Sequence, residues 1–408
     1  MVEFLTLDDV SVKNKTVLLR IDANVPYDEK TGKISDSDRL SEHAKTIREL
    51  SDKHAKTVLL AHQGRRGDAD FIHLAQHAKL LESHVGKEVK FVDDIIGEKA
   101  QECIKALKPG KILLLDNVRF LEDETVEKSA EEHKNSSIVK NLTPLADIFV
   151  NDAFSAAHRS HASIVGFTSA LPSYAGRVME REVEKLESII ITMKISKHDT
   201  FVLGGAKPSD PLEVMDFMLE KGTLEKALVS GVVGELFLIA EGHRLGLTED
   251  FLREKGYMEF LPQAKELLKK YGDKIEMPVD VAIRIDGKRA EILVEELPVD
   301  SLILDIGKRT IDRYAEAIKD SVTIGFKGPS GKYEEKGFDV GTRAVLEAIA
   351  SAKGISLIGG GHTLEALHRL KINREKFTHV SLGGGALIRF LSGKPMPAIE
   401  ALKTARRA

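Results

Sequence analysis

The chain has 408 residues, and its 60 basic and 64 acidic side chains leave a formal net charge of -4. Its length predicts two domains rather than one core, and its near-neutral charge argues against a general nucleic-acid-binding protein. Cys103 is the only cysteine, no apolar run approaches a membrane span, and the first residues lack a signal-peptide pattern, so we expect a cytoplasmic protein.

Short apolar, β-branched runs alternate with amphipathic segments in the first half of the chain. We predict strands at Thr16–Asp22, Thr57–Ala61, Val89–Val92, Lys111–Asn117 and Asp147–Asn151. This alternation indicates a parallel sheet covered by helices. Because ligands of open α/β sheets bind at the carboxyl ends of the strands, the polar residues that follow these runs are candidates for a site.

Five polar clusters lie at or after these predicted strands. They are Asp22-Ala23-Asn24, Asp36-Ser37-Asp38-Arg39, His62-Gln63-Gly64-Arg65-Arg66-Gly67, Asn117-Val118-Arg119, and Asn151-Asp152 leading to His158-Arg159-Ser160-His161. Arginines from separate segments suit an anionic ligand, because guanidinium groups bind carboxylate and phosphate in a bidentate manner. A zinc site at His158 and His161 is the disfavoured alternative, because no cysteine or third ligand lies nearby in the sequence.

Between the halves, Ala175–Met193 has the apolar spacing of one helix face. This segment is either a plain surface helix or a connector that carries a hinge. Beyond it, a second set of apolar runs predicts a second parallel sheet. The runs are Thr200–Gly205, Lys226–Gly231, Leu302–Gly307, Val322–Phe326, Ile355–Gly360 and His379–Gly383.

Glycine-rich turns close five of the strands predicted in the second half. They are Gly204-Gly205-Ala206-Lys207, Gly231-Val232-Val233-Gly234, Gly328-Pro329-Ser330-Gly331, Gly359-Gly360-Gly361-His362-Thr363 and Gly383-Gly384-Gly385. Neither G-x-x-x-x-G-K-[ST] nor G-x-G-x-x-G is present. Glycine lets the backbone approach phosphate, and the amides that open a helix attract anions. We predict a nucleotide site here, with Asp210 as the N-cap of the helix that follows Lys207.

The ordered motifs resemble those of the phosphoglycerate kinase family over essentially the whole chain, and the pattern looks like the archaeal branch of the family. The motifs are Arg20-Ile21-Asp22-Ala23-Asn24-Val25-Pro26, His62-Gln63-Gly64-Arg65, Asp116-Asn117-Val118-Arg119-Phe120, Asn151-Asp152-Ala153-Phe154, Ala157-His158-Arg159-Ser160-His161, Ala175-Gly176-Arg177-Val178-Met179-Glu180, Gly204-Gly205-Ala206-Lys207, Lys327-Gly328-Pro329-Ser330-Gly331 and Gly359-Gly360-Gly361-His362-Thr363.

The resemblance implies an α/β kinase with two doubly wound, parallel-sheet (Rossmann-like) lobes and hinge bending. It places a phosphoglycerate-binding domain at residues 1–174, with the tail 391–408 packing back on it, an interdomain helix at 175–193 and a nucleotide-binding domain at 194–390. The implied reaction is reversible phosphoryl transfer from 1,3-bisphosphoglycerate to ADP in glycolysis and gluconeogenesis. Its products are 3-phosphoglycerate and ATP, and Mg²⁺ is expected to be bound with the nucleotide.

The resemblance also implies roles for individual residues. Phosphoglycerate would bind Asp22, Asn24, Arg39, His62, Arg65, Arg119 and Arg159, and the nucleotide would bind Lys207, Glu334, Gly360, Gly361, His362 and Thr363. Arg39 and Lys207 would act in catalysis, and no residue is assigned as a metal ligand. A general base is not needed, because the attacking carboxylate or phosphate oxygen is already ionised at neutral pH.

Three positions depart from the commoner family pattern. Pro211 and Lys327 stand where lysine and asparagine are usual, and His362 replaces an aspartate that helps bind the metal. Lys327 offers a positive charge in place of the missing lysine. The alternatives are another two-lobed phosphotransferase and a non-catalytic, metabolite-sensing relative, but the presence of Arg39 and Lys207 favours the enzyme. We expect no nucleic-acid or membrane partner, and a monomer, with a homodimer left open.

Overall fold

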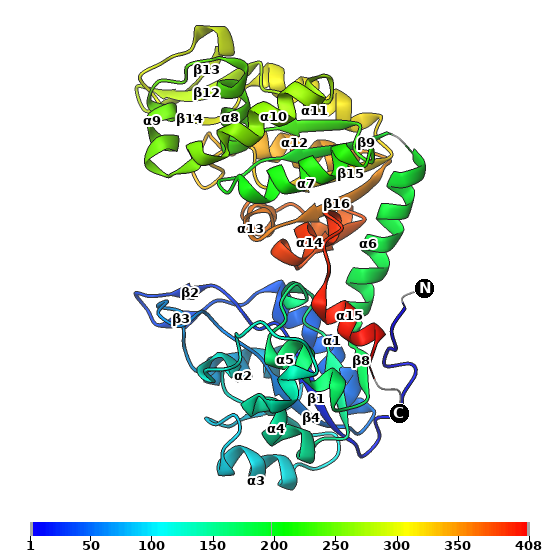
Figure 1. Ribbon diagram of the computed structural model, residues 1–408. Helices are drawn as coiled ribbons and strands as arrows, with labels where there is room; N and C mark the ends of the chain where they lie inside the picture. Colours follow the sequence, from blue (N-terminus) through cyan, green and yellow to red (C-terminus); the bar gives the residue numbers. More distant parts are fainter. Residues whose placement is uncertain (1–2, 197, 406–408) are drawn as a thin grey trace. The chain divides into compact units, whose positions relative to one another are not determined.

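The computed structural model describes residues 3–196 and 198–405, and the chain divides into two compact units (Figure 1). The first comprises Met1–Glu184 and Pro395–Ala408, and the second comprises Lys185–Lys394. The division falls within helix α6, Arg177–Ser196. No helix of the described ranges combines the length and the apolar character that crossing a membrane requires.

The first unit contains a six-stranded sheet in the order β5-β6-β4-β1-β7-β8, in which every neighbouring pair is parallel. The strands are β1 Thr16–Arg20, β4 Lys56–Leu60, β5 Val89–Phe91, β6 Ile112–Leu114, β7 Ile148–Asn151 and β8 Ser173–Ala175. Five of them lie where the apolar runs predicted strands. The sixth, β8, was missed because its sequence, Ser173-Tyr174-Ala175, contains no β-branched residue and no continuous apolar run.

Successive residues of the strands pack on opposite faces of this sheet. Leu19 and Leu59 belong to one buried cluster, and Leu18 belongs to the other. The first face is covered by α1 Asp38–Asp52 and α2 Ala75–Val85. The second is covered by α3 Glu98–Ala106, α4 Ser137–Leu142 and α5 Ala162–Val165. This burial on both faces explains why the strands read as continuous apolar runs.

The end of the chain returns to the first unit. Helix α15, Pro397–Lys403, contacts α5 and β8 (Figure 1). The Ala398 N–H donates to the carbonyl of Ala157 at 3.0 Å. Ala398 and Leu402 of this helix are buried. The chain therefore passes between the two units twice, through α6 and again before Pro395.

The second unit contains another six-stranded parallel sheet, in the order β11-β10-β9-β15-β16-β17. Its strands are β9 Asp199–Leu203, β10 Lys226–Val229, β11 Ile275–Glu276, β15 Thr323–Lys327, β16 Ile355–Gly359 and β17 His379–Ser381. The helices of the unit are α7 Ser209–Glu220, α8 Gly231–Glu241, α9 Leu247–Glu254, α10 Leu261–Tyr271, α11 Lys308–Lys319, α12 Val340–Ser351, α13 Gly361–Arg369 and α14 Gly384–Leu391.

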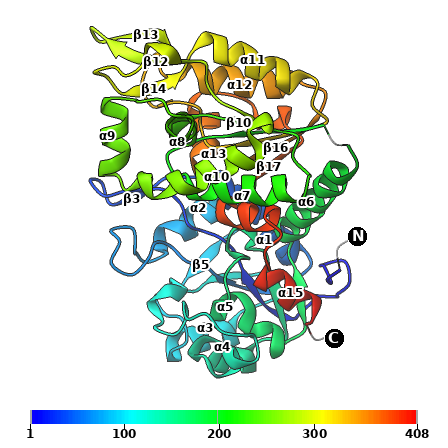
Figure 2. The same ribbon diagram turned by 45° about the horizontal axis from the view of Figure 1, so that its top comes forward.

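The strand predicted at Leu302–Gly307 does not belong to the parallel sheet. It is β14, Ile303–Ile306, which pairs antiparallel with β12, Asp280–Ile285, in a three-stranded sheet that also includes β13, Lys288–Leu293 (Figure 2). Apolar, β-branched runs look alike in both kinds of sheet, so the composition of the run did not reveal its partner. The Asp286-Gly287 turn between β12 and β13 was the available signal, because Asp-Gly favours tight hairpins.

The predicted start of α7 was also wrong. The helix begins at Ser209, so Asp210 lies in its first turn and is not its N-cap. Pro211 lies in the same turn, where the backbone N–H that proline lacks has no helical partner. From this first turn, the Asp210 carboxylate forms an ion pair with Lys327.

Candidate functional site

The register of the first sheet brings the predicted polar clusters to one edge. Arg20, the last residue of β1, lies opposite Leu60 of β4 and Asn151 of β7. The segments that follow these strands therefore leave the sheet side by side, at the carboxyl ends where open α/β sheets bind ligands. The Asp152 N–H donates to the carbonyl of Arg20 at 2.9 Å, which continues the pairing beyond the strands.

Asp22 is the buried centre of this edge. One carboxylate oxygen lies 2.7 Å from a guanidinium nitrogen of Arg39 and also accepts from the Ser155 hydroxyl, and the other accepts from the Asn24 N–H at 3.0 Å. Burial alone raises the pKa of Asp22, but the charge of Arg39 and the hydrogen bonds from Ser155 and Asn24 outweigh it and hold the pKa below its usual value. Asp22 is therefore an ionised acceptor.

His62 lies beside Arg20, which is fully buried. A guanidinium nitrogen of Arg20 lies 3.0 Å from Nδ1 of His62. Burial, followed by the charge of Arg20, lowers the pKa of His62 well below its usual value. Since arginine can only donate, Nδ1 is the acceptor and Nε2 of the neutral ring carries the proton. His62 can thus donate one hydrogen bond from Nε2.

Arg20 is also held by Ser163, which in turn is held by Glu124. Its Nε donates to the Ser163 hydroxyl at 2.8 Å, and Ser163 donates to the Glu124 carboxylate from both its hydroxyl (2.6 Å) and its N–H (2.9 Å). Burial raises the pKa of Glu124 to about 7, although the charge of Arg20 opposes the rise. Sequence analysis assigned no role to Arg20 or Glu124. The sequence did contain an indication of the role of Arg20, because a charged residue at the end of an apolar strand is unusual.

The guanidinium groups of Arg65, Arg119 and Arg159 form a cluster in which one positive charge lowers the pKa of another. Burial, and then the charges of Arg159 and Arg20, lowers the pKa of Arg119 to about 10. Burial, and then the charge of Arg65, lowers the pKa of Arg159. Neighbouring positive charges disfavour the charged form of each arginine, and a bound anion favours it. The cluster therefore favours a ligand with negative charge.

The backbone between these groups requires glycine at position 64. Gly64 has a φ of +65°, and a Cβ there would lie 2.5 Å from the carbonyl oxygen of Asp70. Its N–H donates to the Asn24 side chain at 2.8 Å, and its carbonyl accepts from Arg119. The turn at Gly64 therefore connects the cluster that contains Asn24 with the cluster that contains Arg119, and it positions the next residue, Arg65.

The predicted zinc alternative gains no support from the surroundings of its two histidines. His161 is buried, and its Nε2 lies 3.3 Å from a carboxylate oxygen of Glu127. Burial, and then the charges of Arg159, Arg119 and Arg20, lowers the pKa of His161 to about 3. Within residues 3–196 and 198–405, no three histidine, cysteine, aspartate or glutamate side chains gather in a way that would hold a metal ion.

In the second unit the predicted glycine turns meet at one edge of the parallel sheet. Lys327 of β15 lies opposite Leu203 of β9 and Gly359 of β16, so the turns that follow the three strands are neighbours. The Gly205 N–H donates to the carbonyl of Pro329 at 2.9 Å, and the Gly328 N–H donates to the Thr363 hydroxyl at 3.0 Å.

Close contact between the turns explains their composition. Gly328 has a φ of +84°, and a Cβ on it would lie 2.1 Å from the carbonyl oxygen of Gly204. The turn at Gly231 reaches the same place, because the Val232 N–H donates to the Gly205 carbonyl at 3.3 Å. Gly384 also approaches: a Cβ on it would lie 3.6 Å from Cα of Gly360. All five glycine turns therefore contribute to one backbone-lined edge.

Helices α7, α8, α13 and α14 begin at or just after these turns, and two of them follow the residues predicted to bind the nucleotide. Helix α13 starts at Gly361 and carries His362 and Thr363 in its first turn, and α7 starts two residues after Lys207. Their unpaired amides make the edge attractive to phosphate. Lys207 and His362 are exposed, as is Glu334, whose carbonyl accepts from Arg369 at 2.6 Å.

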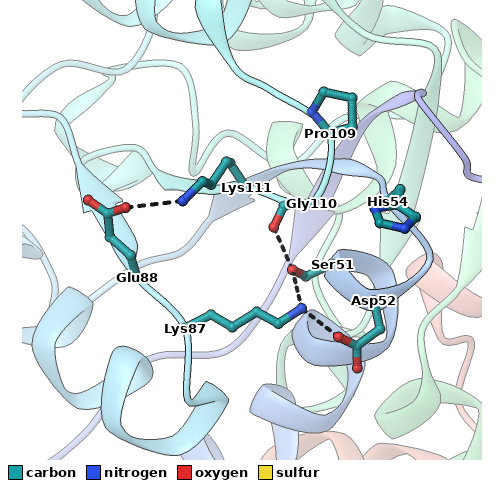
Figure 3. Close-up of a pocket in the computed structure, with 8 residues that line it drawn as sticks. All are labelled: Ser51, Asp52, His54, Lys87, Glu88, Pro109, Gly110 and Lys111. Atoms are coloured by element: carbon teal, nitrogen blue, oxygen red, sulfur yellow. Dashed lines mark hydrogen bonds and ion pairs between the residues drawn. The ribbon is translucent and has the colours of Figure 1, made fainter.

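Two cavities formed by the described residues lie at the amino ends of strands, away from both edges. One, of about 490 Å³, is lined by residues of the first unit that precede β4, β5 and β6, including Lys87 and Lys111 (Figure 3). Both lysines face carboxylates, since Lys87 pairs with Asp52 and Lys111 lies 3.5 Å from Glu88. Ligands of parallel sheets bind at the opposite, carboxyl edge, so we give more weight to the strand-end clusters.

Fold and chemistry together define a class. The first unit presents clustered arginines at the carboxyl edge of its sheet, and the second presents glycine turns and helix N-termini at the carboxyl edge of another. Such a chain is a two-lobed α/β phosphotransferase.

Comparison with known proteins identifies the family. A family model described as phosphoglycerate kinase matches residues 7–394. The phosphoglycerate kinase of Methanobacterium bryantii is 44% identical over 400 residues, which cover 98% of this chain and 97% of the relative. That of Saccharolobus solfataricus is 44% identical over 399 residues, which cover 97% and 96%. The chain belongs to the phosphoglycerate kinase family.

Solved structures agree with this assignment. The crystal structure of phosphoglycerate kinase from Pyrococcus horikoshii OT3 matches with a TM-score of 0.91 at 36% identity, and that of the Coxiella burnetii enzyme matches with 0.80 at 31%, each over 98% of both chains. The predicted family, two-lobed fold and reaction are confirmed: the protein is a glycolytic phosphotransferase with a carboxyl group as acceptor. The curated relatives are mostly archaeal, as the departures from the common pattern predicted.

Proposed function

We propose that the first unit binds 3-phosphoglycerate or 1,3-bisphosphoglycerate through the residues that sequence analysis singled out. They are Asp22, Asn24, Arg39, His62, Arg65, Arg119 and Arg159. The observation that carries this proposal is the placement of Arg39 and Arg119 at one edge, where Asp22 and the Gly64 carbonyl hold them. Burial and the charge of Arg159 lower the pKa of Arg119, and an anionic ligand relieves this repulsion. Ionised Asp22 accepts from the substrate hydroxyl, and neutral His62 donates from Nε2 to a substrate oxygen.

The second unit, in this proposal, binds ADP or ATP at its glycine turns. The phosphates lie against Lys207 and the start of α13, at Gly360, Gly361, His362 and Thr363, and Glu334 contacts the ribose. Support comes from the five converging turns and from the N-termini of α7 and α13, which lie beside them. Backbone amides and one lysine can then share the negative charge of the phosphates.

Arg39 and Lys207 are the proposed catalytic residues. The attacking oxygen is ionised in either direction of the reaction, so neither residue transfers a proton. Their task is to stabilise the charge of the phosphoryl group in transit and to align it. The short ion pair between Arg39 and Asp22 holds the guanidinium in place before the substrate arrives.

We propose that Mg²⁺ arrives with the nucleotide and is held mostly by its phosphates and by water. The described residues offer no cluster of three metal-binding side chains, and His362 supplies nitrogen where magnesium prefers oxygen. His362 then contacts a phosphate or a water of the metal. The metal supplies charge neutralisation, and the residues named above supply the alignment.

We propose further that the two units close on each other during turnover. Phosphoryl transfer needs reacting atoms about 3–3.5 Å apart, and the acyl phosphate must be kept from water. The two crossings of the chain, α6 and the segment before Pro395, are where we place the hinges. We also propose that the enzyme acts in the cytoplasm as a monomer.

Calorimetric titration of the intact chain tests the two binding sites separately. Arg159→Gln should weaken 3-phosphoglycerate binding by tenfold or more and leave the Kd for MgADP within twofold. Lys207→Met should do the reverse. If either variant weakens both ligands equally, or the wrong one, the assignment of the sites to the two units is overturned.

A further inference from the structure

Lys327 occupies the centre of the glycine edge in the second unit. It is the last residue of β15, with Leu203 of β9 opposite on one side and Gly359 of β16 on the other. The turns that follow these two strands carry Lys207 and the N-terminus of α13. Lys327 therefore stands between the two features that we assign to the phosphates.

The side chain of Lys327 is largely buried and lies along this edge. Only 14% of it is exposed, and its Nζ lies 3.2 Å from a carboxylate oxygen of Asp210 in the first turn of α7. Its Cγ lies 3.8 Å from the position that a Cβ on Gly360 would take. The stem thus runs along the backbone that opens α13, and the ammonium group reaches towards the start of α7.

The surroundings of this ammonium group favour an anion. Burial lowers the pKa of Lys327, Asp210 opposes that, and the charge of Lys207 lowers it further. An ammonium group has three N–H donors, and among the described residues the structure pairs it with one carboxylate, which is 43% exposed. A second cation and a helix N-terminus lie near it, so a phosphate oxygen is the group that the arrangement lacks.

We propose that Lys327 is a further catalytic residue, which binds the phosphoryl group in transit together with Lys207, while Asp210 holds its ammonium in place when no nucleotide is bound. This inference rests on the proposed nucleotide site of the second unit. In the direction of ATP synthesis, an oxygen of the ADP β-phosphate forms a bond to phosphorus as the bond from phosphorus to the carboxyl oxygen breaks. No proton moves, and Lys327 stabilises the charge shared between the two oxygens.

The competing explanation is that the pair between Lys327 and Asp210 only fastens β15 to α7. Lys327→Gln separates the two explanations, because the amide, although one bond shorter, keeps an N–H donor on the side of Asp210 but carries no charge. Lys327→Met removes both the charge and the hydrogen bond. A structural lysine would show a loss in the methionine variant that the glutamine variant largely restores.

Steady-state kinetics in both directions, with thermal unfolding of each variant, tests the proposal. We expect both Lys327→Gln and Lys327→Met to lower kcat about 100-fold or more, with the glutamine variant unfolding within a few degrees of the wild type. The matched control is Lys226→Met. Lys226 is the first residue of β10, at the amino edge of the same sheet, and pairs with Glu276 at 2.9 Å. Its kcat should stay within twofold of the wild type.

Two outcomes would overturn parts of the argument, and they can be told apart. If Lys207→Met is inactive but Lys327→Gln keeps near-normal kcat, the nucleotide site stands and the role of Lys327 is wrong. If both variants stay active and bind MgADP normally, the proposed nucleotide site itself is wrong. Asp210→Asn gives an independent reading: freeing Lys327 should tighten MgADP binding by about threefold, and weaker binding would contradict the proposal.

Discussion

At the residue scale, the two sites depend on charges that are aligned before the ligands arrive. Arg39 is fixed by Asp22 at 2.7 Å, and Asp22 is in turn held by Ser155 and the Asn24 N–H. Such preorganised charges act on the transition state with little reorganisation. The buried Arg20 is held in the same way by Ser163 and by the Ile21 carbonyl, and its third contact is to Nδ1 of His62. Burial and the charge of Arg20 keep His62 neutral, so its Nε2 can donate.

The first prediction concerns the two proposed catalytic charges. Arg39→Ala and Lys207→Ala should each cost roughly 3–4 kcal/mol of transition-state stabilisation, so that kcat falls by two to three orders of magnitude. Loss of folding stability should be much smaller. Arg48→Ala is the control for Arg39, because Arg48 lies on the same helix and donates to the carbonyls of Val85 and His84. Near-normal turnover in either folded variant would rule out the assigned role.

His362 gives a prediction about the metal. If Mg²⁺ is held by the nucleotide and water, His362→Ala should leave the Mg²⁺ concentration for half-maximal activity within about twofold of the wild type. An imidazole that coordinated the ion would raise that concentration much more. Activity is measured against free Mg²⁺ at fixed ADP. A nucleotide complex with a direct bond from magnesium to His362 would contradict the proposal.

Glu235 of α8 makes stability depend on pH. Burial raises the pKa of its carboxyl from 4.5 to about 8, and the side chain is only 8% exposed. The folded state therefore holds the proton more tightly than the unfolded state, and stability falls as pH rises from about 4.5 to about 8. Since one pKa unit corresponds to about 1.4 kcal/mol, the loss amounts to a few kcal/mol.

Replacing Glu235 by glutamine tests this sign. Glu235→Gln should unfold at a temperature similar to the wild type at pH 5 and at a clearly higher temperature at pH 8.5. Glu241→Gln, at the exposed end of the same helix, serves as the control and should follow the wild type at both pH values. A variant that gained nothing at pH 8.5 would show that the carboxyl ionises without cost.

At the scale of elements, hydrogen bonds connect the start of α6 to the proposed phosphoglycerate site. Asp152, which follows β7, accepts from the Val178 N–H at 2.8 Å and lies 2.7 Å from Nδ1 of His43. Nε2 of the same histidine accepts from the Asp22 N–H at 3.2 Å. One buried chain of hydrogen bonds therefore joins the backbone of Asp22 to the first turn of α6. All its members lie in the first unit.

Removing the middle of this chain should cost stability. Asp152→Ala leaves the Val178 N–H and His43 without their buried partner, which should lower the free energy of unfolding by roughly 2–4 kcal/mol. Asp123→Ala is the matched control: Asp123 accepts from the Ser137 N–H at the start of α4 but is partly exposed, so we expect about 1 kcal/mol. Urea unfolding measures both, and equal losses would contradict the argument.

At the scale of the whole molecule, the proposed closure involves the two compact units of the chain. Each carries one proposed site, and the chain links them only through α6 and the segment before Pro395. We expect a single ligand to close the enzyme partly and both ligands to close it most. Solution scattering of the apo, singly liganded and ternary forms should show the radius of gyration falling in that order. One unchanged value across all forms would count heavily against hinge closure.

Much of this architecture could be read from local patterns. The apolar runs located ten strands of the two parallel sheets, and the glycine turns and strand-end arginines located both edges. These features depend on the period and composition of a few neighbouring residues, so the sequence alone determines them. The ordered motifs also identified the family, because their combination is far more specific than any one of them.

Only the tertiary structure decided which distant side chains meet. Arg20 and Ser163 are 143 positions apart and are joined by the strand order, and Lys327 finds Asp210 because β15 lies beside β9. The run at Leu302–Gly307 looked like a strand of the parallel sheet, yet it pairs antiparallel with β12. Strand order, register and the first residue of a helix depend on packing over the whole unit. A pattern of a few neighbouring residues therefore does not predict them.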